Sequence, residues 1–267
     1  MPLWIALVLG IVEGLTEFLP VSSTGHLVLA DRLLGSVQDH ASFDIVIQLG
    51  AVFAVLIHYR KLLLERAAGV LRRDPVAIRL FVALLIAFLP VAVVGLALRS
   101  IIHKLLFGLM PVAAARIVGG VVMIVVDRWM RSRSDRQPLD GLEHVTPRRA
   151  LLIGLGQCAA LWPGTSRSMS TIVTAQLAGL STATAAEFSF LLALPALGAA
   201  TVFEGLKARH TLLEGAGGPA LAVGLVVSFL VAWAALASFL SYVKRRGMEP
   251  FGYYRIVLGI AILIFLR

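Results

Sequence analysis

Two carboxylates four residues apart stand in an apolar stretch near the start of the chain. Glu13 and Glu17 occupy positions i and i+4, which places both side chains on one face of a helix. An unpartnered carboxylate at membrane depth costs at least about 2.5–3.5 kcal/mol, so the pair predicts a bound cation or a watery cavity. Because oxygen-only ligation suits hard cations, we expect Mg²⁺ or Ca²⁺ at these two residues.

A polar turn follows the two carboxylates. Pro20 ends the helix, and the next residues supply hydroxyl and backbone N–H groups suited to phosphate oxygens. These residues are Ser22, Ser23, Thr24 and Gly25. His26 adds a group that can accept or donate a proton. Small and hydroxyl residues are also common where membrane helices pack, but two glutamates in the same stretch favour a functional site.

A second polar motif interrupts another apolar stretch. It contains Gly164, Thr165, Ser166, Arg167 and Ser168. The planar guanidinium of Arg167 suits bidentate phosphate binding. Long uncharged runs flank it, which argues against a side chain that merely extends to a membrane surface. On a hairpin that faces the first motif, Arg167 would oppose the two glutamates.

The composition identifies a bilayer as the solvent of this chain. Of its 267 residues, 59% are hydrophobic and 15% are charged, and the mean hydropathy is +0.91, outside the range of soluble domains. Cys158 is the only cysteine, which excludes an internal disulfide and cysteine-based zinc or redox motifs. The net charge of +9 lies in short basic runs between apolar segments, so no nucleic-acid partner is expected.

Apolar segments predict an all-α polytopic membrane protein with six transmembrane helices and two re-entrant hairpins. The six spans are 43–58, 80–98, 111–127, 187–203, 219–241 and 251–266. Segments 3–30 and 150–178 are each broken in the middle by Pro, Gly, Ser and Thr. They predict helix-loop-helix hairpins, because non-helical backbone at membrane depth must be surrounded by protein or a watery cavity.

Basic residues sort the connections into two groups. They gather in 58–79, 128–149 and 244–246, which the positive-inside rule places in the cytoplasm. They are few in 31–42, 99–110 and 204–219, which are expected outside together with both chain ends.

The two halves of the chain resemble each other, with Pro20 matched to Pro163. A hairpin plus three spans is an odd number of crossings, so the second copy must be inverted relative to the first. We expect a single membrane domain, 1–267. It would contain a first repeat at 1–127, a cytoplasmic connection at 128–149 and a second repeat at 150–267.

Three segments resemble the signature segments of the bacterial undecaprenyl pyrophosphate phosphatase family, which is associated with bacitracin resistance. They read EGLTEFLPVSSTGH at 13–26, FDIVIQLG at 43–50 and QCAALWPGTSRS at 157–168. The resemblance covers essentially the whole chain. It implies a metal-dependent enzyme of the bacterial plasma (inner) membrane that converts undecaprenyl pyrophosphate to undecaprenyl phosphate, recycling the carrier for wall polymers. It also implies an active site facing the periplasm or exterior.

The resemblance places the family's acidic pair, Ser-rich turn, histidine and arginine motif on residues of these segments. The implied catalytic residues are Glu13, Glu17, Ser23, His26 and Arg167, with the two glutamates as metal ligands. The implied substrate-binding residues are Ser22, Thr24, Gly25, Gln48, Gly164, Thr165, Ser166 and Ser168. Gln48 lies in the FDIVIQLG segment and either lines the site or bonds to a neighbouring helix. Met169-Ser170 replaces the Gly-Ala expected after the second motif, which bears on how that hairpin packs.

Two routes to phosphate release stay open. Ser23 could attack the terminal phosphorus, or water could attack while the serines bind the pyrophosphate and His26 handles a proton. Ser23 is favoured over Ser22 as nucleophile, because it adjoins the 24–26 stretch, which could supply a base and N–H donors.

Other activities and assemblies are also considered. A lipid-carrier or small-anion transporter could share the same inverted-repeat scaffold. A type 2 phosphatidic acid phosphatase is disfavoured, because its Lys-containing motif and second histidine are missing: after Arg167 the next histidine is His210. The oligomeric state is open, with a homodimer as one possibility.

Overall fold

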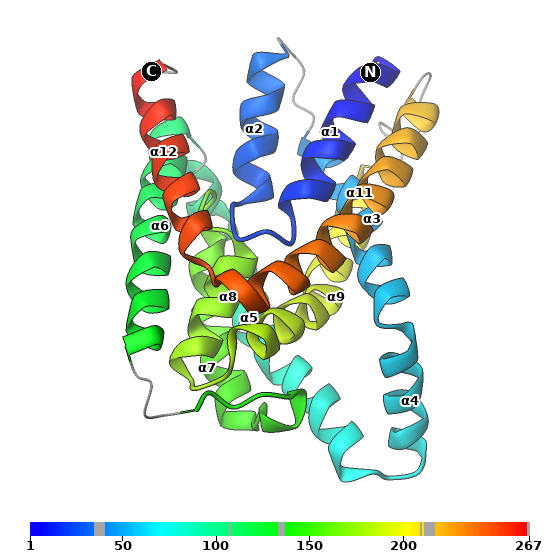
Figure 1. The fold of residues 1–267 in the computed structure, drawn as a ribbon. Helices are drawn as coiled ribbons and strands as arrows, with labels where there is room; N and C mark the ends of the chain where they lie inside the picture. The colour runs from blue at the N-terminus through cyan, green and yellow to red at the C-terminus, as the bar shows by residue number, and fades with distance from the viewer. Residues whose placement is uncertain (35–40, 107, 133–136, 209, 211–216, 266–267) are drawn as a thin grey trace.

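The computed structural model describes residues 1–267 except 35–40, 107, 133–136, 209, 211–216 and 266–267. The described residues form α-helices and two short 3₁₀ helices (Figure 1). The α-helices are α1 (Leu3–Thr16), α2 (Ser23–Leu33), α3 (Ala41–His58), α4 (Arg60–Leu71), α5 (Pro75–Leu106), α6 (Leu109–Ser132), α7 (Pro147–Gln157), α8 (Arg167–Leu177), α9 (Thr182–Lys207), α11 (Gly217–Arg246) and α12 (Glu249–Phe265). The 3₁₀ helices are η1 (Leu142–His144) and η2 (Cys158–Leu161).

Within the described residues, four helices are long and apolar enough to cross a membrane. They comprise Pro75–Leu98, Leu109–Ser132, Thr182–Lys207 and Gly218–Arg246. A fifth span results if the pair Ser42–His58 and Arg60–Leu71, bent by 71°, counts as one. The predicted span 251–266 corresponds to α12, a helix of 17 residues. Residue 266, the last of the predicted span, lies outside the described part of the chain. The prediction of an all-α polytopic membrane protein is therefore confirmed.

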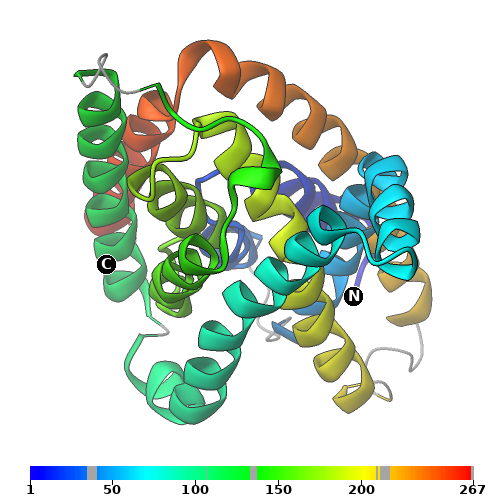
Figure 2. The same ribbon diagram turned by 90° about the horizontal axis from the view of Figure 1, so that it is seen from below.

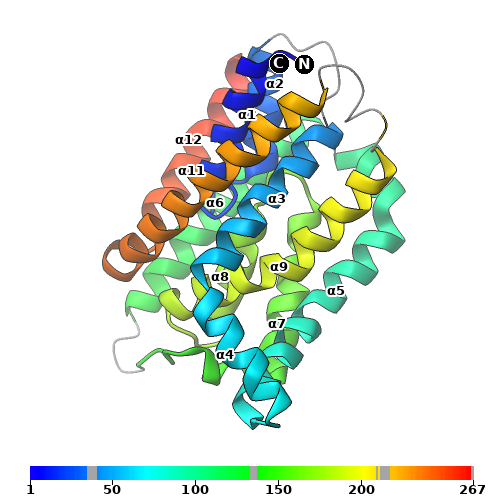
Figure 3. The ribbon, with the colours of Figure 1, turned by 90° about the vertical axis from the view of Figure 1, so that its right-hand side faces the viewer.

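The basic segment 58–79 was expected to be a connection, and most of it is helical. Helix α4 follows α3 directly, and the chain turns at Tyr59, whose φ and ψ are −95° and 14° (Figure 3). None of the residues of α4 is buried. Composition alone did not reveal this helix, because its arginines and lysine lower the mean hydropathy of a segment that also contains several leucines. Leu62 and Leu63 nevertheless pack against the core.

Each polar motif lies in the turn of a hairpin. Helices α1 and α2 enter from the end of the molecule that holds both termini, whereas α7 and α8 enter from the opposite end (Figure 1). Seen from below, α7 and α8 lie inside the outline formed by α5, α6 and α11 (Figure 2). The second hairpin begins earlier than predicted, at Pro147, where the Thr146 hydroxyl accepts a hydrogen bond from Arg149 N and caps α7.

The hairpins pack against the long helices in matching ways. Helix α1 packs along α11, and α7 packs along α5. A glycine permits each approach: a Cβ at Gly10 would lie 2.9 Å from Gly224 O, and a Cβ at Gly154 would lie 2.5 Å from Ala87 O. Helices α3 and α9 also pack together, as do α6 and α12.

The larger of the two buried hydrophobic clusters of the described residues is formed by both hairpins together with α3, α5, α6, α9 and α11. Phe18, at the end of α1, makes an edge contact with Phe190 of α9 at a centroid distance of 5.1 Å. Phe190 in turn contacts Phe239 of α11 at 5.9 Å. Because lipid is as apolar as these rings, their contribution is close van der Waals packing. The cluster fixes the first hairpin turn against the second half of the chain.

The connection between the two halves is tied to the start of α9. The hydroxyls of Ser181 and Thr184 donate to Oδ1 of Asp140 at 2.5 and 2.9 Å. These bonds hold the pKa of the Asp140 carboxyl below its ordinary value, because they stabilise its charged form.

Candidate active site

The first hairpin turn is built around a serine in the left-handed region. Ser22 has φ 73° and ψ 97°, and its Oγ accepts a hydrogen bond from Gly25 N at 3.4 Å, which caps α2. A non-glycine residue with positive φ is strained, and such residues cluster at functional sites. The strained cap places Ser23 at the first position of α2, where the helix N–H groups favour an anion.

The second hairpin turn repeats this geometry. Ser166 has φ 75° and ψ 121°, and its Oγ accepts from Met169 N at 3.3 Å to cap α8. Ser166 is therefore the structural counterpart of Ser22. The sequence match of Pro20 with Pro163 is wrong by one residue, because two residues separate Pro163 from Ser166 and only one separates Pro20 from Ser22.

The corrected match pairs the chemically important residues of the two turns. Ser23 and Arg167 become counterparts, since each follows its capping serine directly. Glu13 becomes the counterpart of Gln157, because these two residues are as far apart in the sequence as Ser22 and Ser166. Gly10 and Gly154 are separated by the same number of residues.

Glu17 joins Ser23 to Arg167 across the two turns. The Ser23 hydroxyl donates a short hydrogen bond to Glu17 Oε2. The other carboxylate oxygen, Oε1, accepts from Arg167 Nη2 at 3.2 Å in an ion pair whose side chains are 11% and 5% exposed. Arg167 Nη1 donates to Ser189 O at 2.9 Å, which fixes the guanidinium. The structure thus brings together three of the residues that the sequence predicts.

Glu13 lies one helical turn before Glu17 and is wholly buried. Neither of its carboxylate oxygens has a hydrogen-bond partner among the residues that the structure describes. A buried carboxylate without a partner is unfavourable unless a ligand compensates it. Mg²⁺ commonly uses one or two protein carboxylates together with water and substrate phosphates, so this residue pair fits such a cation.

His26 is engaged by groups other than Ser23. Its Nδ1 lies 2.7 Å from Ser22 O and 3.0 Å from Arg116 Nη2, and its Nε2 lies 2.7 Å from the Tyr254 hydroxyl. The sequence suggested that the 24–26 stretch could supply a base to Ser23. In the structure Glu17 occupies that position, and His26 links the turn to α6 and α12.

The remaining predicted binding residues separate into three groups. Ser166 and Ser168 are buried in the second turn, and Ser168 Oγ donates across to Leu19 O at 3.1 Å. Thr165 is also buried there, whereas Thr24 is exposed. Gln48 is half-buried on α3, and the contacts described for the site do not include it.

The glycines of the two turns allow close packing against α6, because a Cβ at Gly164 would lie 2.6 Å from Val112 O. A Cβ at Gly25 would lie 2.5 Å from Arg116 Nη2, so a larger residue would displace that guanidinium. Gly164 has φ 95°, and its carbonyl accepts from Arg255 Nη2 at 3.0 Å.

Arg116 and Arg255 are wholly buried, and sequence reasoning overlooked both. Arg116 Nη2 donates to Ser22 O at 3.3 Å, while Arg255 Nη1 donates to Pro20 O at 3.0 Å. Two signals could have identified them. Each is a charge within an apolar segment, which is by default a functional candidate. Each also belongs to the same short motif, in which a proline is followed five residues later by Arg-Ile-Val. The motif occurs once in α6 and once in α12.

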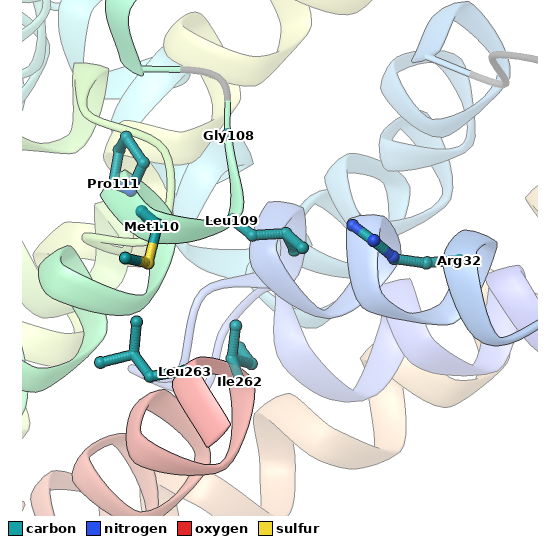
Figure 4. A pocket seen from close by; sticks show the side chains of 7 residues that line it. All are labelled: Arg32, Gly108, Leu109, Met110, Pro111, Ile262 and Leu263. Atoms are coloured by element: carbon teal, nitrogen blue, oxygen red, sulfur yellow. The ribbon is translucent and has the colours of Figure 1, made fainter. Parts of the chain in front are cut away.

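A cavity of about 540 Å³ lies between the C-terminal ends of α2 and α12 and the N-terminal end of α6 (Figure 4). Its lining is formed by Arg32, Gly108, Leu109, Met110, Pro111, Ile262 and Leu263. The same three helices carry His26, Arg116 and Tyr254 farther in. Apolar side chains thus line this space, with one arginine among them.

The family description "bacitracin resistance protein BacA" matches residues 6–261. The chain belongs to the BacA family. Curated relatives support this assignment. The chain is 57% identical over 260 residues to a protein of Sorangium cellulosum named undecaprenyl-diphosphatase, covering 97% of this chain and 84% of that protein.

Two other BacA-family relatives carry the same name. The undecaprenyl-diphosphatase of Rhizorhabdus wittichii is 46% identical over 258 residues, covering 97% of this chain and 95% of that protein. That of Thermoanaerobacter pseudethanolicus is 43% identical over 262 residues, with 97% and 95% coverage. The resemblance identified from three segments of sequence is thus confirmed over nearly the whole chain.

Proposed function

We propose that this chain hydrolyses undecaprenyl pyrophosphate to undecaprenyl phosphate and inorganic phosphate in the bacterial plasma membrane. One observation carries the proposal. A serine hydroxyl donates to a carboxylate that is also paired with an arginine on a second hairpin. Glu17 as base thus contacts both Ser23 as nucleophile and the guanidinium of Arg167, which can bind phosphate. Phosphoryl transfer needs these three kinds of group. The names of the relatives point to the same substrate.

The mechanism assigns a separate task to each of the three contacting groups. Glu17 accepts the Ser23 proton as Ser23 Oγ attacks the terminal phosphorus. The bond from that phosphorus to the bridging oxygen breaks, and undecaprenyl phosphate leaves. Water then attacks the phosphoserine, inorganic phosphate leaves with the hydrogens of that water, and Glu17 returns its proton to Ser23 Oγ. Direct attack by water is the competing route, in which Ser23 only binds the pyrophosphate.

Arg167 is positioned to stabilise the transferring phosphoryl group. Its Nη1 is held by Ser189 O, while its buried Nε has no hydrogen-bond partner among the described residues. The Nε and Nη2 edge therefore offers two parallel donors, the arrangement that binds phosphate oxygens bidentately. Lysine cannot provide this fork.

Glu13 and Glu17 would hold a Mg²⁺ or Ca²⁺ ion. Glu13 offers both of its oxygens, whereas those of Glu17 are already shared between Ser23 and Arg167. When bound, the ion supplies positive charge to the pyrophosphate oxygens.

We also propose the six-span inverted repeat, with both termini and the active site on the periplasmic or outer side. The matched packing of α1 on α11 and α7 on α5 supports it, as do the two capping serines and the repeated Arg-Ile-Val motif. In this arrangement α12 is the sixth span. The basic connections at the opposite end favour the stated orientation.

The cavity at the outer ends of α2, α6 and α12 fits the first part of the isoprenoid chain. Its walls are mostly apolar, and Arg32 lies six residues beyond His26 on α2, roughly 9 Å along the helix. A lipid with its phosphates at the hairpin turns would find apolar surface beside them. A transporter would not require the Ser23–Glu17–Arg167 contact, so the phosphatase is favoured.

Phosphate release tests the proposal directly. Purified protein in detergent with Mg²⁺ or Ca²⁺ should release one phosphate per undecaprenyl pyrophosphate. Arg167→Lys should lower kcat by about 10²–10³-fold, because it loses the bidentate donor edge. Absence of phosphate release from the folded wild-type protein, at saturating lipid and cation, would rule out the phosphatase.

A further inference from the structure

Arg255 is the one described side chain that donates to both hairpin turns. Its Nη1 donates to Pro20 O at 3.0 Å in the first turn, and its Nη2 donates to Gly164 O at 3.0 Å in the second. A third bond, from Nη2 to Ala115 O at 3.2 Å, anchors the guanidinium to α6. The side chain is wholly buried.

The two turn carbonyls that Arg255 binds are structural counterparts. The spacing that relates Ser22 to Ser166 also relates Pro20 to Gly164. Each carbonyl lies three residues before a reacting group, Ser23 in the first turn and Arg167 in the second. One rigid, planar group therefore spans the two points from which both reacting side chains project.

The Arg255 side chain packs tightly against α6. A Cβ at Gly119 would lie 2.4 Å from Arg255 Nη2, so α6 leaves room for the guanidinium only because a glycine stands there. Its repeat counterpart, Arg116, donates to Ser22 O and to His26, but not to the second turn. Of these two buried arginines, only Arg255 donates to both turns among the described contacts.

We propose that Arg255 is a positioning residue for phosphoryl transfer, because its guanidinium fixes the separation and orientation of Ser23 and Arg167. The proposal rests on the phosphatase activity proposed above. Arg255 touches no reacting atom and acts through the backbone of the two turns. Displacement of a reacting group by about 1 Å can cost about 10²-fold in rate, so loss of this bridge should reduce turnover more than binding.

Kinetics of Arg255→Lys in folded, monodisperse protein test this role. Lysine retains the positive charge but cannot hold two carbonyls in one plane. We expect kcat to fall by about 10–100-fold while KM for undecaprenyl pyrophosphate changes by less than about 3-fold. Arg255→Met, which also removes the charge, should be worse. Wild-type kcat in Arg255→Lys would overturn the inference.

A double-mutant cycle separates positioning from general destabilisation. If Arg255 acts by holding Arg167 opposite Ser23, its replacement should matter less once Arg167 is already lysine. The loss in Arg255→Lys/Arg167→Lys should then be clearly smaller than the product of the two single losses. Losses that multiply would show independent effects and would contradict the proposed role.

Arg149 provides a matched control. Its guanidinium also donates to two backbone carbonyls, Ala178 O at 3.1 Å and His144 O at 2.8 Å, but at the end of the molecule away from the hairpin turns. Arg149→Lys should lower thermal stability and leave kcat within about 2-fold. An equal loss of kcat in both lysine variants would overturn the inference, because packing alone would then explain it.

Two further measurements keep the outcome decisive. If Arg255→Lys does not fold, Ser168→Ala removes a different bond between the turns, the one from Ser168 Oγ to Leu19 O, and should also lower kcat without raising KM. An unchanged kcat there would contradict the inference. Wild-type protein that releases no phosphate would instead refute the proposed function itself.

Discussion

Glu17 shares its two oxygens between a hydroxyl and a guanidinium, and this arrangement favours transfer of the Ser23 proton. The bond from Ser23 directs the hydroxyl proton at the carboxylate oxygen that would accept it, while the ion pair with Arg167 fixes the orientation of that carboxylate. A phosphate that draws Arg167 away from Glu17 would also free the carboxylate to act. Substrate binding and activation of the nucleophile are thereby linked at one residue.

Glu17→Gln should nearly abolish turnover in a protein that still folds. The amide has the same shape but cannot accept the Ser23 proton, so we expect kcat to fall by about 10²–10⁴-fold. Phosphate release at saturating lipid and cation measures this loss. Glu65→Gln, at an exposed carboxylate on α4, is the control and should stay within about 2-fold of wild type. A similar rate in both variants would contradict the role of Glu17.

Ser23→Ala and Ser22→Ala should differ sharply. Loss of the nucleophile in Ser23→Ala should lower kcat by about 10³-fold or more, whereas Ser22→Ala removes a helix cap and should cost about 0.5–2 kcal/mol of stability. An acid-quenched single turnover of the wild type should contain phosphoserine at position 23. If no phosphoenzyme forms and Ser23→Ala keeps a large fraction of the rate, water is the nucleophile.

At the scale of elements, close helix contacts position the two turns. Helix α7 approaches α5 so closely at Gly154 that a Cβ there would lie 2.5 Å from Ala87 O. Since α7 leads into the turn that carries Arg167, a shift of this helix moves the guanidinium as well.

Gly154→Ala should therefore destabilise the protein, even though alanine is the better helix former. We expect a loss of about 1–3 kcal/mol from the forced separation of α7 and α5. Gly198→Ala is the matched control in α9, where nothing lies within 4 Å of the added Cβ, and it should be neutral or slightly stabilising. Thermal unfolding in detergent compares the two variants. Equal midpoints would argue against the close contact.

Much of this arrangement of elements could be predicted from the sequence. Pro20 and Pro163 interrupt apolar segments that are otherwise long enough to cross a membrane, and this signal located both hairpins. Helix α4 was missed because its basic residues suggested an exposed connection. The one-residue offset between the turns was also missed, because two prolines are easily aligned and backbone dihedral angles are not visible in a sequence.

The candidate site was predicted only in part. Paired carboxylates and an isolated arginine in apolar surroundings are rare enough to be recognised, and Glu17, Ser23 and Arg167 do meet. Arg116 and Arg255 were missed because one charge hardly lowers the hydropathy of a long apolar helix. Two of the partners of His26, Arg116 and Tyr254, belong to α6 and α12, so its place in the site depends on tertiary contacts that no local pattern encodes.

At the scale of the whole molecule, the charge asymmetry predicts the orientation in the membrane. Cysteines replacing Glu143 and Arg246 in a Cys158→Ser background should resist an impermeant thiol reagent in intact cells. A cysteine replacing His210, on the side expected to be external, should react. The neighbouring residues 211–216 lie outside the described part of the chain. Lysed cells control for reactivity at each position. Labelling in the opposite sense would reverse the proposed orientation.

The cavity should affect recognition of the lipid chain and not the chemistry. Met110→Trp fills part of the space, so KM for undecaprenyl pyrophosphate should rise by about 10-fold, equivalent to about 1.4 kcal/mol, with little change in kcat. Val118→Trp, at an exposed position of the same helix, is the control. A pyrophosphate with a single isoprene unit should be insensitive to both. An equal effect on the short substrate would remove the cavity from the binding path.

The matched turns of the two hairpins have a consequence for the ancestry of the chain. Under the proposed inverted repeat, two identical half-length chains inserted in opposite orientations would place the same residue at positions 23 and 167, for example serine facing serine or arginine facing arginine. Neither ancestor would hold a nucleophile and its guanidinium partner together. Gln157 and Leu161 likewise stand where the first half has Glu13 and Glu17. If the two halves arose by duplication, as the proposed inverted repeat implies, the Ser23–Glu17–Arg167 set required their sequences to diverge at these positions.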